Sequence, residues 1–108
     1  MTTRTEFQRV RRDGRAKAGR FVVLSTLGDS ELPFLKVGFI TTRRVGQAHD
    51  RNRLRRRVRA IVQRHGERLK EPARYLVTIP RPGSSEASFQ ALEADWLRQA
   101  KRLGILRD

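Results

Sequence analysis

Arginine dominates the stretch from residue 43 to residue 65, RRVGQAHDRNRLRRRVRAIVQRH. It contains nine arginines and a single acid, Asp50. Because a guanidinium group donates hydrogen bonds in a planar fork that fits phosphate, such a run suits a phosphate-rich partner. On a helix, Arg51, Arg55 and Arg59 would lie one turn apart and repel each other, a cost that a bound anion offsets. The pattern therefore predicts a polyanion-binding helix rather than a solvated face of mixed charge.

Side chains suited to catalysis are sparse. His49 and His65 lie sixteen residues apart, without the spacing of metal ligands, and the chain has no cysteine. Glu67 and Glu71 form the only helically spaced acid pair and are typical of a solvated helix end. The glycines match neither a phosphate-binding loop nor a dinucleotide fingerprint. We therefore expect no catalytic residue and no metal site in the protein itself.

Length and charge narrow the class of protein. With 108 residues, the chain is expected to form a single domain over residues 1–108 with one modest core. Its formal net charge is +14, and only four of its 25 basic residues are lysines. This arginine bias favours nucleic acid as the partner. No stretch has the length of a signal peptide's apolar region or of a membrane span, so we expect a cytoplasmic protein without membrane contact.

Apolar spacing predicts the elements that must position the arginines. A short helix is expected at 4–12, strands at 21–27, 34–42 and 75–79, a long helix up to residue 65, and a last helix capped by Ser84 or Ser85. Residues 15–20 are interpreted as a turn-like linker, and the first two strands as joined by a hairpin-like connection. The order αββαβα indicates an α+β class. The long helix should bury Leu54, Val58, Ile61 and Val62, and the last helix Phe89, Leu92, Trp96, Ala100 and Leu103.

Charge alone leaves DNA and RNA open, but the motif itself resembles a known family. RNRLRRRVR, preceded by RRVGQAHD and by the strand VGFITT, is similar to the signature of the bacterial ribonuclease P protein component family. The starting helix EFQRVRRDGR, the strands FVVLSTL and YLVTIPRP, and the closing helix follow in the order of that family. The resemblance covers most of the chain.

This resemblance implies a fold and a function. The family's fold is a compact two-layer α+β domain, similar to ribosomal-protein folds, with an unusual left-handed βαβ crossover. Its catalytic centre belongs to a separate RNA, which cleaves precursor tRNA with magnesium to make the mature 5′ end. The protein binds that RNA, one protein per RNA, and holds the single-stranded 5′ leader in a cleft between the first helix and the sheet. It needs no cofactor of its own.

Site residues follow from matching positions in the family. The resemblance implies that the RNA-binding residues are Arg43, Arg44, Arg51, Asn52, Arg53, Arg55, Arg56 and Arg59. It implies that the leader cleft contains Phe7, Arg11, Val23 and Ser25. Arg11 and Ser25 stand where the family often has aromatic residues, so phosphate contacts are expected to outweigh stacking here. Phe7 is either a stacking surface for an unpaired base or a core residue.

Three other functions remain open from the residues. The chain could be a ribosome-associated RNA-binding protein, which would sediment with ribosomal subunits. It could be a sequence-tolerant DNA-binding protein that uses residues 51–59 as a groove helix, which would prefer duplex DNA to a structured RNA. A protein-only nuclease would cleave without any RNA partner.

Overall fold

The computed structural model describes residue 1 and residues 3–107. The helices in this part of the chain are α1 (Arg4–Asp13), α2 (Ala48–His65) and α3 (Phe89–Arg102). The strands are β1 (Arg15–Ala18), β2 (Val22–Gly28), β3 (Lys36–Phe39) and β4 (Arg74–Pro80). Short 3-10 turns, η1 (Arg43–Val45), η2 (Gly66–Arg68) and η3 (Ser84–Glu86), lie in the connections. The α+β class expected from the sequence is confirmed.

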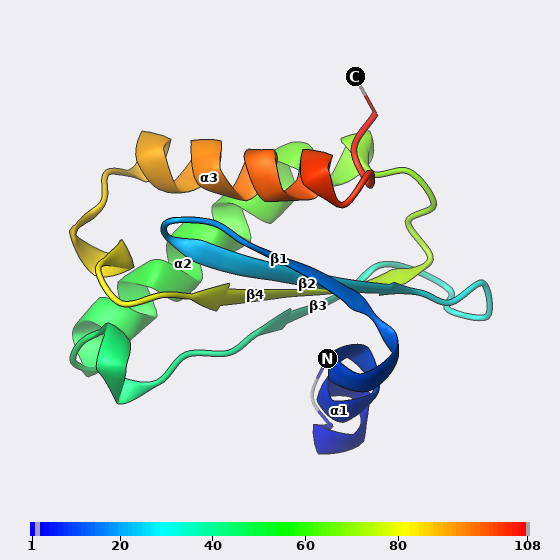
Figure 1. The fold of residues 1–108 in the computed structure, drawn as a ribbon, viewed down its shortest axis with the longest axis horizontal. Coiled ribbons are helices and arrows are strands. Elements are labelled where there is room, and N and C mark those ends of the chain that lie inside the picture. The colour runs from blue at the N-terminus through cyan, green and yellow to red at the C-terminus, as the bar shows by residue number, and fades with distance from the viewer. Residues whose placement is uncertain (2, 108) are drawn as a thin grey trace.

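The four strands form one mixed sheet in the order β1-β2-β4-β3. Strand β2 pairs antiparallel with both β1 and β4, whereas β3 pairs parallel with β4. Figure 1 shows α2 and α3 on one face of the sheet and α1 on the other. A crossover through α2 therefore joins β3 to β4, and its left hand stays a prediction of the family resemblance.

Strand β4 lies at the centre of the packing and is buried along almost its whole length. Leu76 contributes to the core beneath α2 and α3, and Thr78 accepts a hydrogen bond from the buried Trp96 of α3. Tyr75 and Val77 pack in a second cluster with Val10 of α1. A strand that is covered on both faces has an almost uninterrupted apolar sequence, which explains the residues YLVTI.

The larger core lies between the sheet and the helices α2 and α3. The stripe expected on α2 is confirmed, because Leu54, Val58, Ile61 and Val62 are all buried. On the last helix, Leu92, Trp96, Ala100 and Leu103 are fully buried and Phe89 is partly buried against them. The arginines of α2 are thereby held on the side that faces away from the core.

The expected order αββαβα is wrong by one strand, because residues 15–18 form β1 rather than a linker. Charged residues and alanines alternate along RAKA, so no apolar run marks the strand. These residues form a strand because they pair with β2, for example Ala16 opposite Ser25. The Gly19 N–H, which donates to the Val22 carbonyl over 2.8 Å, closes the turn between the two strands.

Two further expectations need correction. β2 and β3 are not hairpin partners, because β4 lies between them and pairs with both. The last helix does not begin at Ser84 or Ser85, which form the short turn η3. Its N-cap is Ser88, whose hydroxyl accepts from the Ala91 N–H over 3.1 Å. The first error arose because tertiary contacts decide which strands pair, whereas the second was a choice among nearby serines that can each cap a helix.

The core position of Trp96 generates a stability prediction. The Trp96 side chain is 0% exposed, and its indole N–H donates to the Thr78 hydroxyl over 3.1 Å. Trp96→Ala should lower the free energy of unfolding by about 3 to 5 kcal/mol, because it leaves a cavity. Trp96→Phe should cost less, since it fills most of the space. Urea unfolding measures both, with Gln90→Ala on the exposed side of α3 as a control; equal stability of Trp96→Ala and wild type would contradict this packing.

Candidate nucleic-acid interface

The exposed side of α2 carries a row of arginines. Arg55, Arg56 and Arg59 are exposed and Arg51 is half-buried, while the opposite side of the helix lies in the core. Among the residues that the structure describes, no carboxylate forms an ion pair with any of these four. Their charges therefore remain free for an external anion, as the sequence predicts.

A groove runs beside this row, between α2 and the edge strand β3. It has a volume of about 500 Å³ and is lined by Phe39, Val58 and Val62 as well as by Arg55 and Arg59. The Arg55 guanidinium lies over the Phe39 ring, 5.3 Å from its centroid. An arginine on an aromatic face keeps its planar group in a fixed orientation while its N–H groups remain available.

Two arginines of the same helix have a different role. Arg53 donates to the Ser85 carbonyl over 2.7 Å and lies 3.6 Å from Asp50, and Arg57 donates to the Ala87 carbonyl over 2.9 Å. They therefore tie α2 to the connection between β4 and α3. Of the residues in the predicted RNA-binding set, Arg53 is thus partly engaged within the protein.

The turn before α2 brings further cations to the start of the helix. Arg43 and Arg44 are exposed in η1, and Asn52 is exposed on α2. Arg43 and Arg51 line one open hollow of about 600 Å³ with His49 and Asp50. The Gln47 N–H donates to the Asp50 carboxylate over 3.1 Å, which orders the first turn of the helix. Asp50 therefore stabilises the first turn of α2.

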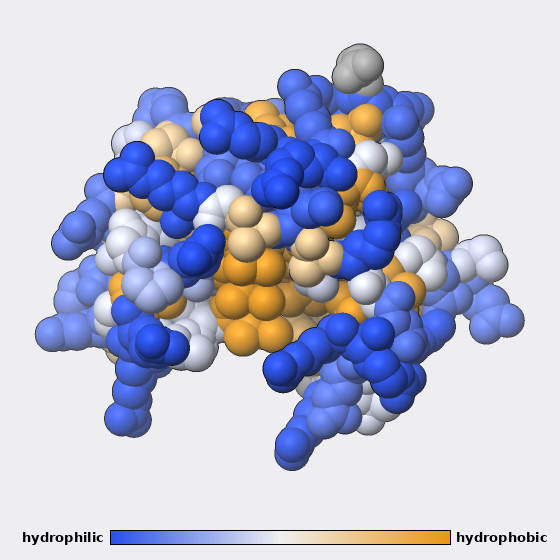
Figure 2. All heavy atoms as spheres, in the orientation of Figure 1, coloured by the Kyte–Doolittle hydropathy of each residue, from blue (hydrophilic) through white to orange (hydrophobic). Residues whose placement is uncertain are grey.

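A second site lies on the other face of the sheet, between α1 and the strands. This cleft has a volume of about 380 Å³. All four residues predicted for the leader cleft line it: Phe7, Arg11, Val23 and Ser25. Figure 2 shows hydrophobic atoms exposed in the middle of this face, beside α1, with hydrophilic atoms on either side. The cleft thus has a mostly apolar lining, to which Arg11 adds a cation.

The sequence did not single out every residue of the cleft. Ala16, Ile40, Val77 and Ile79 also line it. Val77 and Ile79 alternate with Leu76 and Thr78 along β4, so the period of two could have assigned them to the α1 face. Ala16 could not be found in this way, because β1 itself was missed.

Phe7 packs on the sheet and also faces the cleft, and stacking on a base stays a prediction. Its ring packs on β3, where a Cβ on Gly38 would come within 2.7 Å of Phe7 Cε1. The side chain also lines the cleft and is only half-buried. The glycine lets the ring approach the strand closely while another part of the ring stays accessible.

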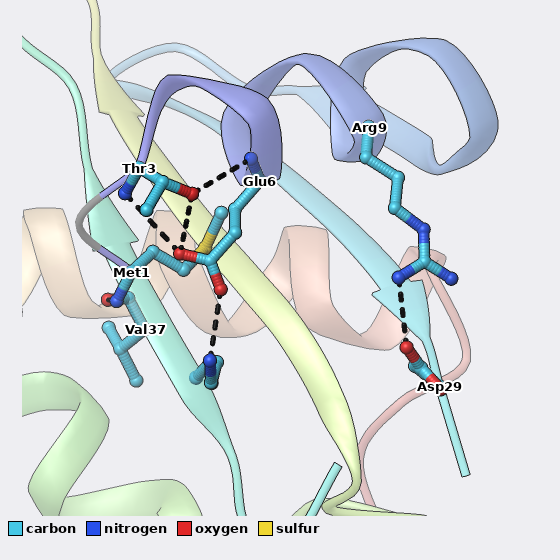
Figure 3. A network of polar contacts seen from close by, with 7 residues as sticks. Met1, Thr3, Glu6, Arg9, Asp29 and Val37 are labelled. Carbon is cyan, nitrogen blue, oxygen red and sulfur yellow. Dashed lines mark hydrogen bonds and ion pairs between the residues drawn. The ribbon is translucent and has the colours of Figure 1, made fainter. Parts of the chain in front are cut away.

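Ion pairs fix the position of α1 on the sheet. Arg9 donates to Asp29 over 2.9 Å, and Lys36 of β3 pairs with Glu6 over 3.0 Å. Figure 3 shows Arg9 reaching from α1 to Asp29 and Glu6 beside Thr3 at the start of the helix. The Glu31 backbone N–H and the Arg9 guanidinium hold the pKa of Asp29 below its usual value, so this carboxylate is charged at neutral pH.

The described residues contain no group of three or more His, Cys, Asp or Glu side chains placed to hold a metal ion. His65 is half-buried, stacks on Trp96 and contacts Glu93 over 3.0 Å, so it belongs to the edge of the core. Within the same residues, no helix is long and apolar enough to span a membrane.

Known proteins are similar to this chain in sequence. A family model described as Ribonuclease P matches residues 1–104. The ribonuclease P protein component of Thermus scotoductus is 38% identical over 101 residues, which are 94% of this chain and 57% of that protein. The Syntrophomonas wolfei protein of the same name is 31% identical over 103 residues, or 95% of this chain and 85% of that protein. The chain therefore spans little more than half the length of the Thermus relative.

Solved structures share the fold. The RNase P protein of Staphylococcus aureus has a TM-score of 0.89 at 20% identity, covering 99% of this chain and 96% of that one. The RNase P protein of Thermotoga maritima has a TM-score of 0.82 at 24% identity, covering 94% of each chain. The arginine-rich motif on α2, the fold and the match over residues 1–104 agree, and the chain belongs to the ribonuclease P protein family.

Proposed function

We propose that the protein is the RNA-binding subunit of ribonuclease P, and that it promotes cleavage of precursor tRNA at the mature 5′ end. The basic side of α2 binds the catalytic RNA, and the cleft beside α1 holds the single-stranded leader of the precursor. One protein acts with one RNA, in the cytoplasm. The family membership and the two surfaces described above support this function.

One observation carries the proposal: adjacent residues of β3 serve both surfaces. Gly38 lies against Phe7 on the side of α1, while Phe39 lies under Arg55 on the side of α2. Successive residues of a strand point to opposite faces, so the four-residue strand separates the two sites by the thickness of the sheet. RNA that passes this edge can contact both sites at once.

The protein's contribution is electrostatic. Catalytic RNA and precursor tRNA repel each other through their phosphates, and the free guanidinium groups of α2 reduce this repulsion where the two meet. These contacts position the substrate without reading its sequence. The carboxylates of the described residues do not form a metal-binding group. We therefore assign the magnesium ions and the chemical step to the RNA and its substrate.

Cleavage of a labelled precursor tRNA by a ribonuclease P RNA at low magnesium tests this function. We expect faster cleavage when RNA and protein are both present, and no cleavage by the protein alone. A folded protein that does not stimulate the RNA would overturn the proposal. Sedimentation with ribosomal subunits, or preference for duplex DNA, would then identify the alternative. Cleavage without RNA would show that the protein has its own active site.

The arginine row of α2 generates a second prediction. Arg55→Ala with Arg59→Ala should weaken binding to ribonuclease P RNA and lower the log–log salt slope by about two, since each lost phosphate contact removes about 0.9. Salt titrations of the Kd measure this slope. Lys70→Ala with Arg107→Ala removes the same charge from the far end of α2 and should keep most of the slope. Equal slopes for both double variants would exclude a specific role for Arg55 and Arg59.

The cleft generates a third prediction. Phe7→Leu keeps apolar packing on Gly38 but removes the flat ring. It should weaken binding of a precursor tRNA with a leader by about tenfold, because stacking of a base on an aromatic ring contributes about 1 to 3 kcal/mol. Binding of mature tRNA, which has no leader, should not change. The ratio of the two affinities, measured in the complex with RNA, decides whether the ring contacts the leader.

A further inference from the structure

A second group of cations lies at the opposite edge of the sheet from β3. It consists of side chains from β1, from the turn between β1 and β2, from the end of β4 and from the outer side of α3. We call these residues the β1–α3 surface: Arg15, Lys17, Arg20, Arg81, Arg98, Lys101 and Arg102. In Figure 2, hydrophilic atoms predominate over α3, with hydrophobic atoms among them.

Hydrogen bonds to backbone carbonyls hold three of these guanidinium groups in place. Arg15 donates to the Leu103 carbonyl over 2.7 Å, Arg102 to Ala18 over 3.2 Å, and Arg81 to Gly19 over 2.6 Å. These bonds join β1, its turn and the end of α3 into one unit. A guanidinium group has five N–H donors, so each retains several for another acceptor. These three guanidinium groups are therefore ordered before any partner binds.

No carboxylate neutralises this surface. Within residues 1 and 3–107, none of the seven cations takes part in an ion pair. The acid that α3 places beside the turn, Asp95, is 5% exposed. It accepts the backbone N–H groups of Phe21 and Val22, over 2.9 and 3.0 Å, and a Gln99 amide over 3.1 Å. The Asp95 carboxylate is therefore occupied by hydrogen bonds within the fold.

A purely structural explanation accounts for only part of the group. Cations near the end of a helix are favoured by the helix dipole, which suits Lys101 and Arg102. The same explanation does not apply to Lys17 on β1 or Arg20 in the turn. In addition, Arg98 lies one turn before Arg102, so the two repel each other. A polyanion bound to the surface would remove this repulsion.

The composition of the surface favours RNA over a lipid membrane. The aromatic residue that lies beside it, Phe21, is half-buried, and Arg20 lies over its ring, 5.1 Å from the centroid. A membrane-binding face would present several apolar side chains to the lipid. Fixed guanidinium groups without an apolar stripe match the regularly spaced phosphates of a structured RNA instead.

We propose that the β1–α3 surface binds a second segment of RNA backbone while α2 is occupied. β1 and β3 are the two edges of the sheet, about 14 Å apart across three strand spacings. The core of the protein lies between the two basic surfaces. The protein can therefore hold two RNA segments at once. This inference rests on the proposed function, because it requires that α2 binds the first RNA.

A bridging experiment tests the proposal with an RNA hairpin of about 20 base pairs, a length that offers phosphates over the whole width of either surface. One copy of the hairpin is biotinylated and immobilised, and a second copy is fluorescent and free. The wild-type protein should capture the fluorescent copy on the immobilised one. Fluorescence anisotropy with the free hairpin measures the affinity for one RNA separately.

The test variant is Arg98→Gln with Lys101→Gln, which changes two exposed side chains of α3. It should bind one hairpin with nearly wild-type affinity but capture about tenfold less of the second copy, because two phosphate contacts are lost. Lys70→Gln with Arg107→Gln, which removes the same charge elsewhere, should still bridge. Thermal unfolding of each variant verifies that it is folded.

Each other outcome overturns a defined statement. Tight binding of one hairpin without bridging by the wild-type protein would overturn the second surface alone. Bridging by the α3 variant at the wild-type level would also overturn it. Failure of the wild-type protein to bind any hairpin would overturn the proposed function as well. Binding of the α3 cations to anionic phosphatidylglycerol vesicles in place of RNA would replace this proposal with a membrane contact.

Discussion

The parallel pairing of β3 with β4 is the constraint on which the rest of the structure depends. Parallel neighbours cannot be joined by a tight turn and need a crossover of a dozen or more residues. Here the crossover contains α2, whose 18 residues pack their apolar stripe on the sheet. The arginines on the other side of α2 are therefore presented along the β3 edge. The same pairing leaves β3 at an edge, where one strand contacts both α1 and α2 side chains.

Five of the eleven acids of the chain help to build this arrangement. Asp29 and Glu6 hold α1, Asp50 orders the start of α2, and Asp95 fixes the turn between β1 and β2. Glu93 contacts Arg64 and His65 near the end of α2. The other six acids are far outnumbered by the 25 basic residues, so an excess of arginine stays on the surface. The net charge of +14 follows from composition alone, and the placement of these five acids decides where positive charge is left on the surface.

The sequence predicted those features that local pattern determines. The apolar period identified the buried side of α2 and hence its basic side, and the motif around Asn52 identified the family. The period cannot show which strands pair, so the position of β4 between β2 and β3 was missed. β1 was missed because its residues form a strand only through pairing with β2. The orientation of Arg53 toward Ser85 depends on a loop distant in sequence, which no local pattern contains.

The antiparallel pairing of β2 with β4 also bears on how the chain reaches its fold. Residues far apart in sequence, such as Ser25 and Val77, meet in this ladder, and the whole arginine-rich helix lies between them. Folds dominated by such distant contacts form slowly, and a large excess of one charge opposes compaction. An RNA that binds the folded chain more tightly than the unfolded one shifts the folding equilibrium toward the folded state by mass action. Binding of such an RNA and folding are then thermodynamically linked, so the RNA raises the folded fraction of the protein.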